Sequence, residues 1–267
     1  MAPGTSIDPM SANETLMRVC DAALFDLDGV LTPTAEVHMH AWARMFNEYL
    51  ASRAAGTSPL RQAQGRSSSG NNEPYTDADY FAHVDGKPRY DGVRDILASR
   101  GIELPWGDPS DPAEAETVCG LGNRKNVSFA AVLASDGVTP YPGSVRLLDY
   151  LATKGVAVAV VSSSQNADAV LTAAGLRDRF EVVVDGRLAH AEGLPGKPAP
   201  DTYLRAAVAL GVPKERAVVF EDAVSGTEAG RAGAFGLVVG VDRGVGAQTL
   251  LDSGADLVVS DLAELLP

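Results

Sequence analysis

At 267 residues, of which 45% are hydrophobic and 21% charged, the chain is long enough for one large domain or for a core domain with a smaller companion. The formal net charge of −13 argues against a general nucleic-acid-binding surface, which needs a basic face, but it does not exclude a small anionic substrate. No run approaches the ~18 apolar residues that span a bilayer, and two cysteines are too few for a disulfide framework. We therefore expect a soluble, cytoplasmic protein that has no nucleic-acid or membrane partner. We also expect a monomer, because no exposed apolar stripe stands out in the sequence.

Residues 1–18 are expected to be a flexible leader, because Met1–Asn13 lacks the charged start and the apolar middle of a signal peptide. Ala22–Leu27 is a short apolar run of the kind that is buried on both faces in a parallel sheet. It ends in Asp26-Leu27-Asp28-Gly29, where two carboxylates are followed by a glycine that lets the chain turn. Because ligands bind beyond the carboxyl ends of parallel strands, this strand is predicted to carry two acids to a functional site.

The stretch 33–139 is predicted to be a mostly helical block. Ala35–Ala54 carries apolar residues at three- and four-residue steps, which is typical of a helix with one buried face. Residues 55–74 are rich in Gly, Ser, Gln and Asn, and they are predicted to be a flexible insertion. Further helical segments are predicted near residue 77 and over Asp91–Arg100, Glu114–Cys119 and Lys125–Ala134.

From Tyr141 onward the pattern changes to alternating strands and helices. Strands are predicted over Val156–Val161, Glu181–Val184, Ala217–Phe220, Gly236–Gly240 and Leu257–Val259, with helices over Ala167–Ala174, Pro200–Leu210 and Ser225–Ala232. This alternation predicts a doubly wound, parallel-sheet α/β core of the Rossmann-like kind. The core would comprise residues 19–32 and 140–267, and the helical block 33–139 would be a cap domain inserted after the first strand.

Four polar clusters follow predicted strands or lie in loops beside them. They are Asp26 with Asp28, the segment Ser162–Asn166, Lys197 in a proline-braced loop, and the pair Glu221-Asp222. Hydroxyls at a helix start can seat a phosphate, a lysine can neutralise one, and adjacent carboxylates suit Mg²⁺. Together they form a set for metal-assisted phosphoryl transfer, in which one carboxylate attacks in line.

Each cluster taken alone has a plainer interpretation. Asp26 and Asp28 could be solvated turn acids, and the serines of Ser162–Asn166 could simply cap a helix. Lys197 could be a solvated loop lysine, and Glu221-Asp222 could be a helix N-terminal acid pair. Only the combination favours chemistry over these alternatives.

With these motifs, FDLDGVLT, VVSSSQN, GKPAPD and FEDAVSG, the chain from about Asp21 onward resembles the haloacid dehalogenase-like phosphotransferases. The cap resembles that of the β-phosphoglucomutase family in three segments: Thr34–His38, Val84–Arg89 and Asn123–Asn126. Two positions depart from the family pattern. Pro33 stands where an acid is frequent, and Gln165 stands where a lysine is common.

The resemblance implies a role for each matching residue. Asp26 would be the nucleophile that becomes an aspartyl phosphate, and Asp28 the general acid/base, which also supplies a backbone carbonyl to Mg²⁺. Glu221 and Asp222 would complete the metal site with Asp26, and Ser162 and Lys197 would hold the transferring phosphoryl group.

The resemblance also implies that Arg89 of the cap, together with Ser164 and Asn166, would bind the phosphate at the far end of the sugar. Thr34, His38 and Lys125 would couple cap closure to the positioning of Asp28. Without that context, His38 would be a packing histidine, and Arg89 and Lys125 would be solvated charges.

The resulting hypothesis is an Mg²⁺-dependent β-phosphoglucomutase activity that interconverts β-D-glucose 1-phosphate and glucose 6-phosphate. It would proceed through the aspartyl phosphate and a glucose 1,6-bisphosphate intermediate. The alternative is a sugar-phosphate phosphatase on the same scaffold. A third candidate is a non-catalytic binding protein, but such a protein would not need the carboxylates of both Asp26 and Asp28.

Overall fold

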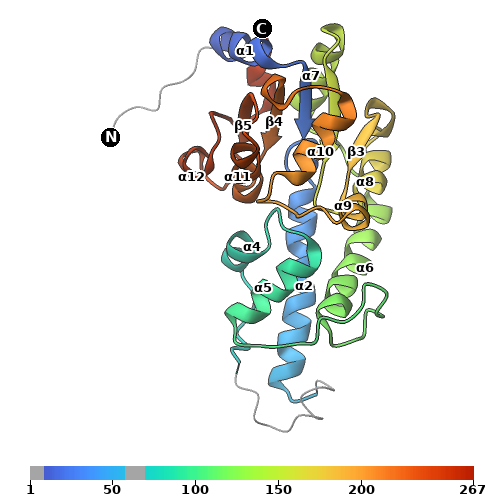
Figure 1. Cartoon of the computed structure of the whole chain (residues 1–267). Helices are drawn as coiled ribbons and strands as arrows, with labels where there is room; N and C mark the ends of the chain where they lie inside the picture. The colour runs from blue at the N-terminus through green and yellow to red at the C-terminus, as the bar shows by residue number, and fades with distance from the viewer. Residues whose placement is uncertain (1–8, 58–69) are drawn as a thin grey trace. The chain divides into compact units, whose positions relative to one another are not determined.

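The computed structural model describes residues 9–57 and 70–267. The chain divides into two compact units, one made of Met1–Pro33 with Val138–Pro267 and the other of Thr34–Gly137. The cap domain predicted from the sequence covers 33–139, and each of its bounds lies within two residues of those of the second unit. We refer to the two units as the core unit and the cap unit (Figure 1).

The core unit is built on a six-stranded sheet in the order β3-β2-β1-β4-β5-β6, in which all neighbours are parallel. The strands are β1 (Ala22–Phe25), β2 (Ala157–Val161), β3 (Val182–Val184), β4 (Ala217–Glu221), β5 (Leu237–Val241) and β6 (Leu257–Val259). The predicted doubly wound parallel α/β sheet is thus confirmed. The strand order reverses between β1 and β4, and in such sheets this switch point is where ligands bind.

One helix precedes the first strand, and helices lie between the later strands, as a parallel sheet requires. They are α1 (Pro9–Val19), α7 (Pro142–Thr153), α8 (Ala167–Ala173), α9 (Gly186–Glu192), α10 (Asp201–Leu210), α11 (Val224–Gly233) and α12 (Ala247–Ser253), with short 3₁₀ turns η1 (Arg177–Arg179), η2 (Lys214–Arg216) and η3 (Leu262–Leu265). On one sheet face, Leu24 packs with Tyr203 and Ala206 of α10. Phe25 points to the opposite face, where its ring stacks on Phe220 at 4.6 Å between centroids.

The cap unit contains four helices in its described part: α2 (Thr34–Ala54), α4 (Asp77–His83), α5 (Arg89–Ser99) and α6 (Val118–Asp136). One apolar cluster joins all four. It includes Phe46 of α2, Tyr80 of α4, Ile96 of α5 and Leu121 of α6, which are buried together. The periodic apolar positions predicted for the first of these helices therefore do face a core.

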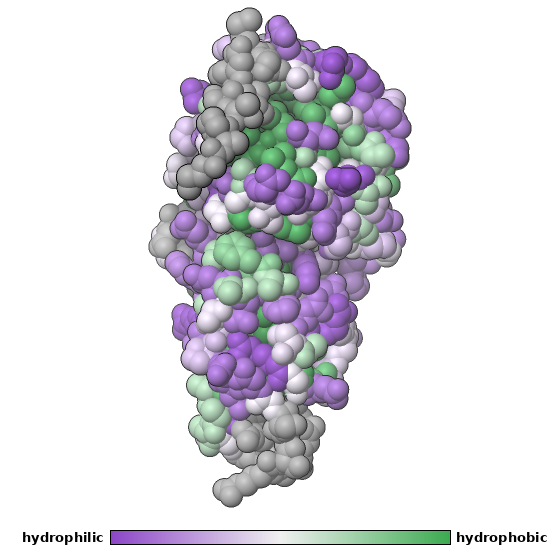
Figure 2. Space-filling view, turned by 90° about the vertical axis from the view of Figure 1, so that its left-hand side faces the viewer, coloured by the Kyte–Doolittle hydropathy of each residue, from purple (hydrophilic) through white to green (hydrophobic). Residues whose placement is uncertain are grey.

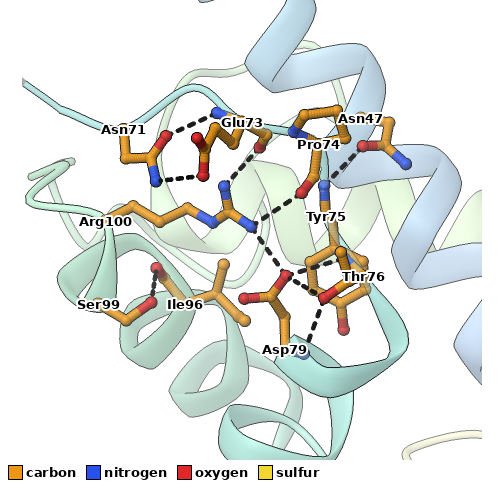
Figure 3. Close-up of polar contacts among 10 residues, drawn as sticks. All are labelled: Asn47, Asn71, Glu73, Pro74, Tyr75, Thr76, Asp79, Ile96, Ser99 and Arg100. Carbon is orange, nitrogen blue, oxygen red and sulfur yellow. Dashed lines mark hydrogen bonds and ion pairs between the residues drawn. The ribbon is translucent and has the colours of Figure 1, made fainter.

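Arg100, just beyond α5, connects the end of the predicted insertion 55–74 to the helices of the cap (Figure 3). Its guanidinium donates to the carbonyl oxygens of Glu73 and Pro74 and pairs with Asp79 at 2.9 Å. Asp79 also closes a capping box with Thr76 at the start of α4. Residues 71–74 of the predicted flexible insertion thus form hydrogen bonds with the rest of the cap unit, whereas residues 58–69 lie outside the described residues.

Two segments differ from the sequence-based expectation. The predicted leader includes helix α1, whose Leu16 is fully buried and whose Asn13 donates to the Leu265 carbonyl at 2.7 Å. The two helical segments predicted around residues 114–134 are a single helix, α6, which begins at Val118 after the N-cap Thr117. Residues 114–117 are not helical.

No helix in the described ranges 9–57 and 70–267 is both long and apolar enough to cross a membrane. On the face shown in Figure 2, hydrophilic residues cover much of the surface, and apolar residues gather mainly in its upper half. The large apolar side chains that are exposed come from separate elements: Phe81, Trp106, Val127, Val208 and Leu251. Single exposed side chains of this kind are normal on a protein surface.

Candidate active site

Asp26 lies directly beyond the end of β1, at the switch point of the sheet. Its backbone N–H donates to the carbonyl oxygen of Phe220 at 2.9 Å, which continues the β1–β4 ladder by one residue. The side chain is only 7% exposed. The first predicted acid is therefore a buried carboxylate that is held by the rigid centre of the sheet.

Lys197 is the hub of the site. Its ammonium group, which is buried, donates to Asp26 Oδ1, to Glu221 Oε1 at 2.6 Å and to the Val161 carbonyl at 3.1 Å. Burial alone would lower the pKa of Lys197, but the carboxylates of Asp26 and Glu221 outweigh it and raise that pKa. The lysine is therefore charged at neutral pH, and the plainer interpretation of a solvated loop lysine is wrong.

Glu221 ends β4 and is as buried as the lysine that it contacts. Its Oε1 also accepts a hydrogen bond from the Tyr203 hydroxyl at 2.7 Å, and its Oε2 accepts from the Ala223 N–H at 3.3 Å. Glu221 thus orients Lys197. Gly226 makes room for it, because a Cβ there would lie 1.8 Å from the Glu221 carboxyl carbon.

The carboxylates outnumber the one ammonium. Burial raises the pKa of Asp26, and the charges of Glu221 and Asp28 raise it further, while Lys197 opposes them. Carboxylate oxygens of Asp26, Glu221 and Asp222 lie within 4.8 Å of one another. This is a hard, oxygen-only donor set with excess negative charge, which fits Mg²⁺.

The turn after Asp26 is set by glycine geometry and by Arg243. Gly29 has φ of +86°, and a Cβ on it would fall 1.7 Å from Asp222 Oδ2, so neither the turn nor the close approach admits a side chain. Arg243 donates from Nε to the Gly29 carbonyl at 2.8 Å and lies over the Tyr141 ring at 3.8 Å. Asp28, which is partly exposed, therefore lies on a turn that Arg243 stabilises, beside the pair Glu221-Asp222.

Ser162 and the residues after it follow β2 on the other side of β1. The Ser162 hydroxyl is buried and accepts from the Ser164 N–H, and the Ser164 hydroxyl accepts from the Asn166 N–H, both at 3.1 Å. These bonds shape the turn into α8. Ser162 also directly follows Val161, whose carbonyl Lys197 contacts, so it lies next to the lysine hub.

In the cap unit, Arg89 begins α5 and contacts α6. Its Nη2 donates to Asn126 Oδ1 at 3.0 Å, and its Nη1 lies 3.5 Å from Asn123 Oδ1. Burial lowers the pKa of Arg89, and the neighbouring Tyr90 partly offsets this. Arg89 is thus a half-buried cation, and the interpretation of a solvated charge is wrong.

The other predicted cap residues form a second group. Lys125 is buried, contacts His38 Nδ1, and lies 5.2 Å from the Trp42 ring centroid and 4.9 Å from that of Phe129. The His38 ring stacks on Phe129 at 4.0 Å. Thr34, 1% exposed, begins α2. His38 and Lys125 therefore meet, while Arg89 belongs to the separate group around Asn126.

Sequence reasoning missed four residues that support these groups: Tyr203, Arg243, Tyr90 and Asn123. Only Asn123 had a signal, because it belongs to the segment that resembles the mutase cap. The others act through contacts that are distant in the sequence. Arg243, for example, is 214 positions from Gly29.

The fold and this site define the class of the protein. A family model described as haloacid dehalogenase-like hydrolase matches residues 20–233. The chain belongs to this family, and within it to the β-phosphoglucomutase-like branch. The predicted family is thereby confirmed.

Several proteins that are similar to this chain are described as β-phosphoglucomutases. A β-phosphoglucomutase of Mycobacterium bovis is 52% identical over 253 residues, which cover 92% of this chain and 91% of the relative. A β-phosphoglucomutase of Bacillus subtilis is 32% identical, with 91% of each chain covered. The crystal structure of a β-phosphoglucomutase from Clostridium difficile has a TM-score of 0.70 at 23% identity and covers 92% of this chain and 93% of that one, which supports the fold.

Proposed function

We propose that the chain is an Mg²⁺-dependent β-phosphoglucomutase, which interconverts β-D-glucose 1-phosphate and glucose 6-phosphate through glucose 1,6-bisphosphate. The observation that carries the proposal is the charged Lys197 held between the Asp26 nucleophile position and the Glu221-Asp222 pair. A carboxylate, an ammonium and a set of metal-binding oxygens are the requirements for transferring a phosphoryl group through an aspartyl phosphate.

In the proposed first half-reaction, an Asp26 carboxylate oxygen attacks the phosphorus of the bound bisphosphate in line. The bond from phosphorus to the sugar oxygen breaks as the new bond forms, and Asp28 gives its proton to that oxygen. In the second half-reaction Asp28 removes the proton from a hydroxyl of the next sugar, which takes the phosphoryl group from Asp26. Mg²⁺, held by Asp26, Asp222, Glu221 and the Asp28 carbonyl, would neutralise charge on the phosphoryl oxygens.

The transferring phosphoryl group would be held by Lys197 and Ser162. A bisphosphate that must bind in two orientations also needs a cationic anchor for the phosphate that does not react. We assign that anchor to Arg89, assisted by Ser164 and Asn166. The support is that Arg89 is held by neutral oxygen atoms, so its charge is left for an anion.

Cap closure would keep water from the aspartyl phosphate. In this proposal Thr34, His38 and Lys125 link closure to the positioning of Asp28, and the buried contact between His38 and Lys125 supports a joint role. The enzyme would act as a monomer in the cytoplasm, where sugar phosphates are metabolised and where the free, buried thiols Cys20 and Cys119 would stay reduced.

The second candidate is a sugar-phosphate phosphatase, favoured by the hydrolase description of the family as a whole. In that reaction water, rather than a sugar hydroxyl, takes the phosphoryl group from Asp26. The same core residues would serve, but no distal cationic anchor is required. The two candidates therefore differ in the acceptor.

The test is to supply β-glucose 1-phosphate with Mg²⁺ and a trace of glucose 1,6-bisphosphate, and to identify the products. The proposal expects glucose 6-phosphate. Free glucose with inorganic phosphate would establish the phosphatase instead.

Asp26→Asn should lower either activity by more than about 10⁴-fold while the protein stays folded. A folded variant with normal turnover would refute the nucleophile assignment. Asp21→Asn, at an exposed acid before β1, is the matched control and should keep full turnover.

A further inference from the structure

Arg89 is held in the cap by partners that leave its charge uncompensated. Three other cap arginines, Arg44, Arg94 and Arg100, pair with carboxylates. Arg89 instead contacts the side-chain amide oxygens of Asn123 and Asn126, and within residues 9–57 and 70–267 it forms no ion pair. A half-buried guanidinium with only neutral acceptors keeps its full attraction for an anion.

Asn123 is itself clamped, so its oxygen has one orientation. Its Nδ2 donates to the carbonyls of Pro109 at 3.0 Å and Asp111 at 2.9 Å. Its Oδ1 accepts from the Tyr90 hydroxyl at 2.9 Å and faces Arg89 Nη1. Two donors and two acceptor contacts use the whole hydrogen-bonding capacity of the amide. An aspartate of the same shape could not make the two donor contacts.

Tyr90 and Arg89 pack against α6 where α6 lacks a side chain. A Cβ on Gly122 would lie 2.7 Å from the Tyr90 ring and 3.1 Å from Arg89 Cδ. The guanidinium lies 5.7 Å from the Tyr90 ring centroid, and the Trp106 ring meets Tyr90 edge-on at 6.4 Å. Arg89 is thus surrounded by a rigid bracket of uncharged groups, which we call the Arg89 bracket: Tyr90, Gly122, Asn123 and Asn126.

We propose that Asn123 and Tyr90 are positioning residues, which orient the Arg89 guanidinium toward the non-reacting phosphate of the sugar substrate without neutralising it. The inference rests on the proposed function and deepens it, because it makes the bracket a determinant of selectivity for substrates with a distal phosphate. A compound that lacks such a phosphate should not sense the bracket.

The test is a double-mutant cycle between Arg89→Ala and Tyr90→Phe. Tyr90→Phe removes one hydroxyl and keeps the ring, so the fold should tolerate it. We expect it to raise the KM for β-glucose 1-phosphate about five- to tenfold, the effect of losing one neutral hydrogen bond and the order that it imposes. The kcat/KM for hydrolysis of acetyl phosphate, which has no distal phosphate, should fall less than twofold.

The coupling between the Arg89→Ala and Tyr90→Phe substitutions shows whether Tyr90 acts by positioning Arg89. If Tyr90 acts through Arg89, then Tyr90→Phe should add nothing in the Arg89→Ala background. Additive losses, or equal losses with acetyl phosphate, would mean a purely structural role and would overturn the inference. Asn123→Asp, which brings a carboxylate to Arg89, should raise the KM further than Tyr90→Phe. Tyr150→Phe, at a hydroxyl that contacts Asn13 in the core unit, is the matched control.

Calorimetric binding of glucose 6-phosphate without turnover separates this inference from the function on which it rests. If the wild type binds glucose 6-phosphate and the cycle, read out as the affinity for glucose 6-phosphate, shows coupling, but no interconversion occurs, the proposed function fails and the inference stands. If the wild type interconverts the sugars and the cycle is additive, only the inference fails. A wild type that does not bind glucose 6-phosphate overturns both.

Discussion

At the scale of single residues, the site is a problem of charge balance. One ammonium, that of Lys197, contacts both Asp26 and Glu221, while Asp222 and Asp28 add two more acids nearby. Burial is the main cause of the raised pKa of Asp26, and the excess of negative charge raises it further. A divalent cation would remove the excess and favour the ionised nucleophile, which links the electrostatics to the proposed cofactor.

Gly29→Ala tests the geometry beside the oxygens that we propose to bind the metal. The new Cβ would fall 1.7 Å from Asp222 Oδ2, so Asp222 must move. We expect the Mg²⁺ concentration for half-maximal activity to rise about 10- to 100-fold. The Mg²⁺-induced rise in melting temperature, measured without substrate, should shrink in parallel.

The matched control is Gly155→Ala. Gly155 has a similar positive φ of +69°, but a Cβ there meets nothing within 4 Å. It should cost about 1 kcal/mol of folding free energy and leave the Mg²⁺ response unchanged. If both variants shift the Mg²⁺ response equally, backbone strain and not Asp222 is responsible, and the metal assignment loses its support.

At the scale of elements, the cap depends on the network around Arg100. Arg100 joins the chain before α4 to the end of α5, and Asp79 joins it to the first turn of α4. Burial alone would raise the pKa of Asp79, but hydrogen bonds from Thr76 and the contact with Arg100 outweigh it and lower that pKa. Asp79 therefore stabilises the cap only while it is ionised.

The sign of the pH dependence follows from the lowered pKa. The contribution of Asp79 to the stability of the cap is fully present above the unfolded pKa of about 4. It is lost as the pH falls through the lower pKa of Asp79 in the folded protein. We predict that the cap loses stability in acid below about pH 4 and that Asp79→Asn removes part of this dependence. Both tryptophans, Trp42 and Trp106, belong to the cap unit, so unfolding followed by tryptophan fluorescence reports on it.

Asp77→Asn, in the same first turn of α4, is the matched control for this prediction. It should leave the acid dependence close to that of the wild type, because Arg100 contacts Asp79 and not Asp77. Identical acid profiles for Asp79→Asn and the wild type would contradict the role assigned to Asp79.

The sequence predicts the strands more accurately than the helices. The strands were predicted to within one or two residues, because buried parallel strands are continuous apolar runs. Helix α6 is predicted as two segments, which leave out Gly120 and Gly122. Both glycines are there for packing: a Cβ on Gly120 would lie 2.3 Å from the Ala115 carbonyl oxygen, and one on Gly122 would meet Tyr90. Such contacts between elements leave no periodic signal.

Helix α1 was missed for a related reason. Its buried side chains are few, with Leu16 and Ala12 one turn apart, and Asn13 bonds to η3 at the far end of the chain. No local pattern indicates a helix that is stabilised by residues 252 positions away. The acids that we propose to be catalytic, in contrast, stand at strand ends, where a parallel sheet predicts a site.

At the scale of the whole molecule, strand order brings the chemistry together. The order β3-β2-β1-β4-β5-β6 makes β1 the neighbour of both β2 and β4, although β2 and β4 follow it by 135 residues or more along the chain. Asp26 and Ser162 directly follow β1 and β2, and Glu221 is the last residue of β4. The sequence predicted this convergence, but the Arg89 bracket of the cap became visible only in the folded structure.

In the proposed reaction, the phosphoryl group leaves Asp26 for a sugar hydroxyl and not for water. The most direct test is a single-turnover experiment with Mg²⁺, unlabelled glucose 1,6-bisphosphate and β-glucose 1-phosphate labelled with ¹³C in all carbons. The first glucose 6-phosphate formed should be unlabelled, and the label should enter the bisphosphate, because each product carbon skeleton derives from the preceding bisphosphate. Labelled glucose with inorganic phosphate, or labelled glucose 6-phosphate formed before any labelled bisphosphate, would contradict the account.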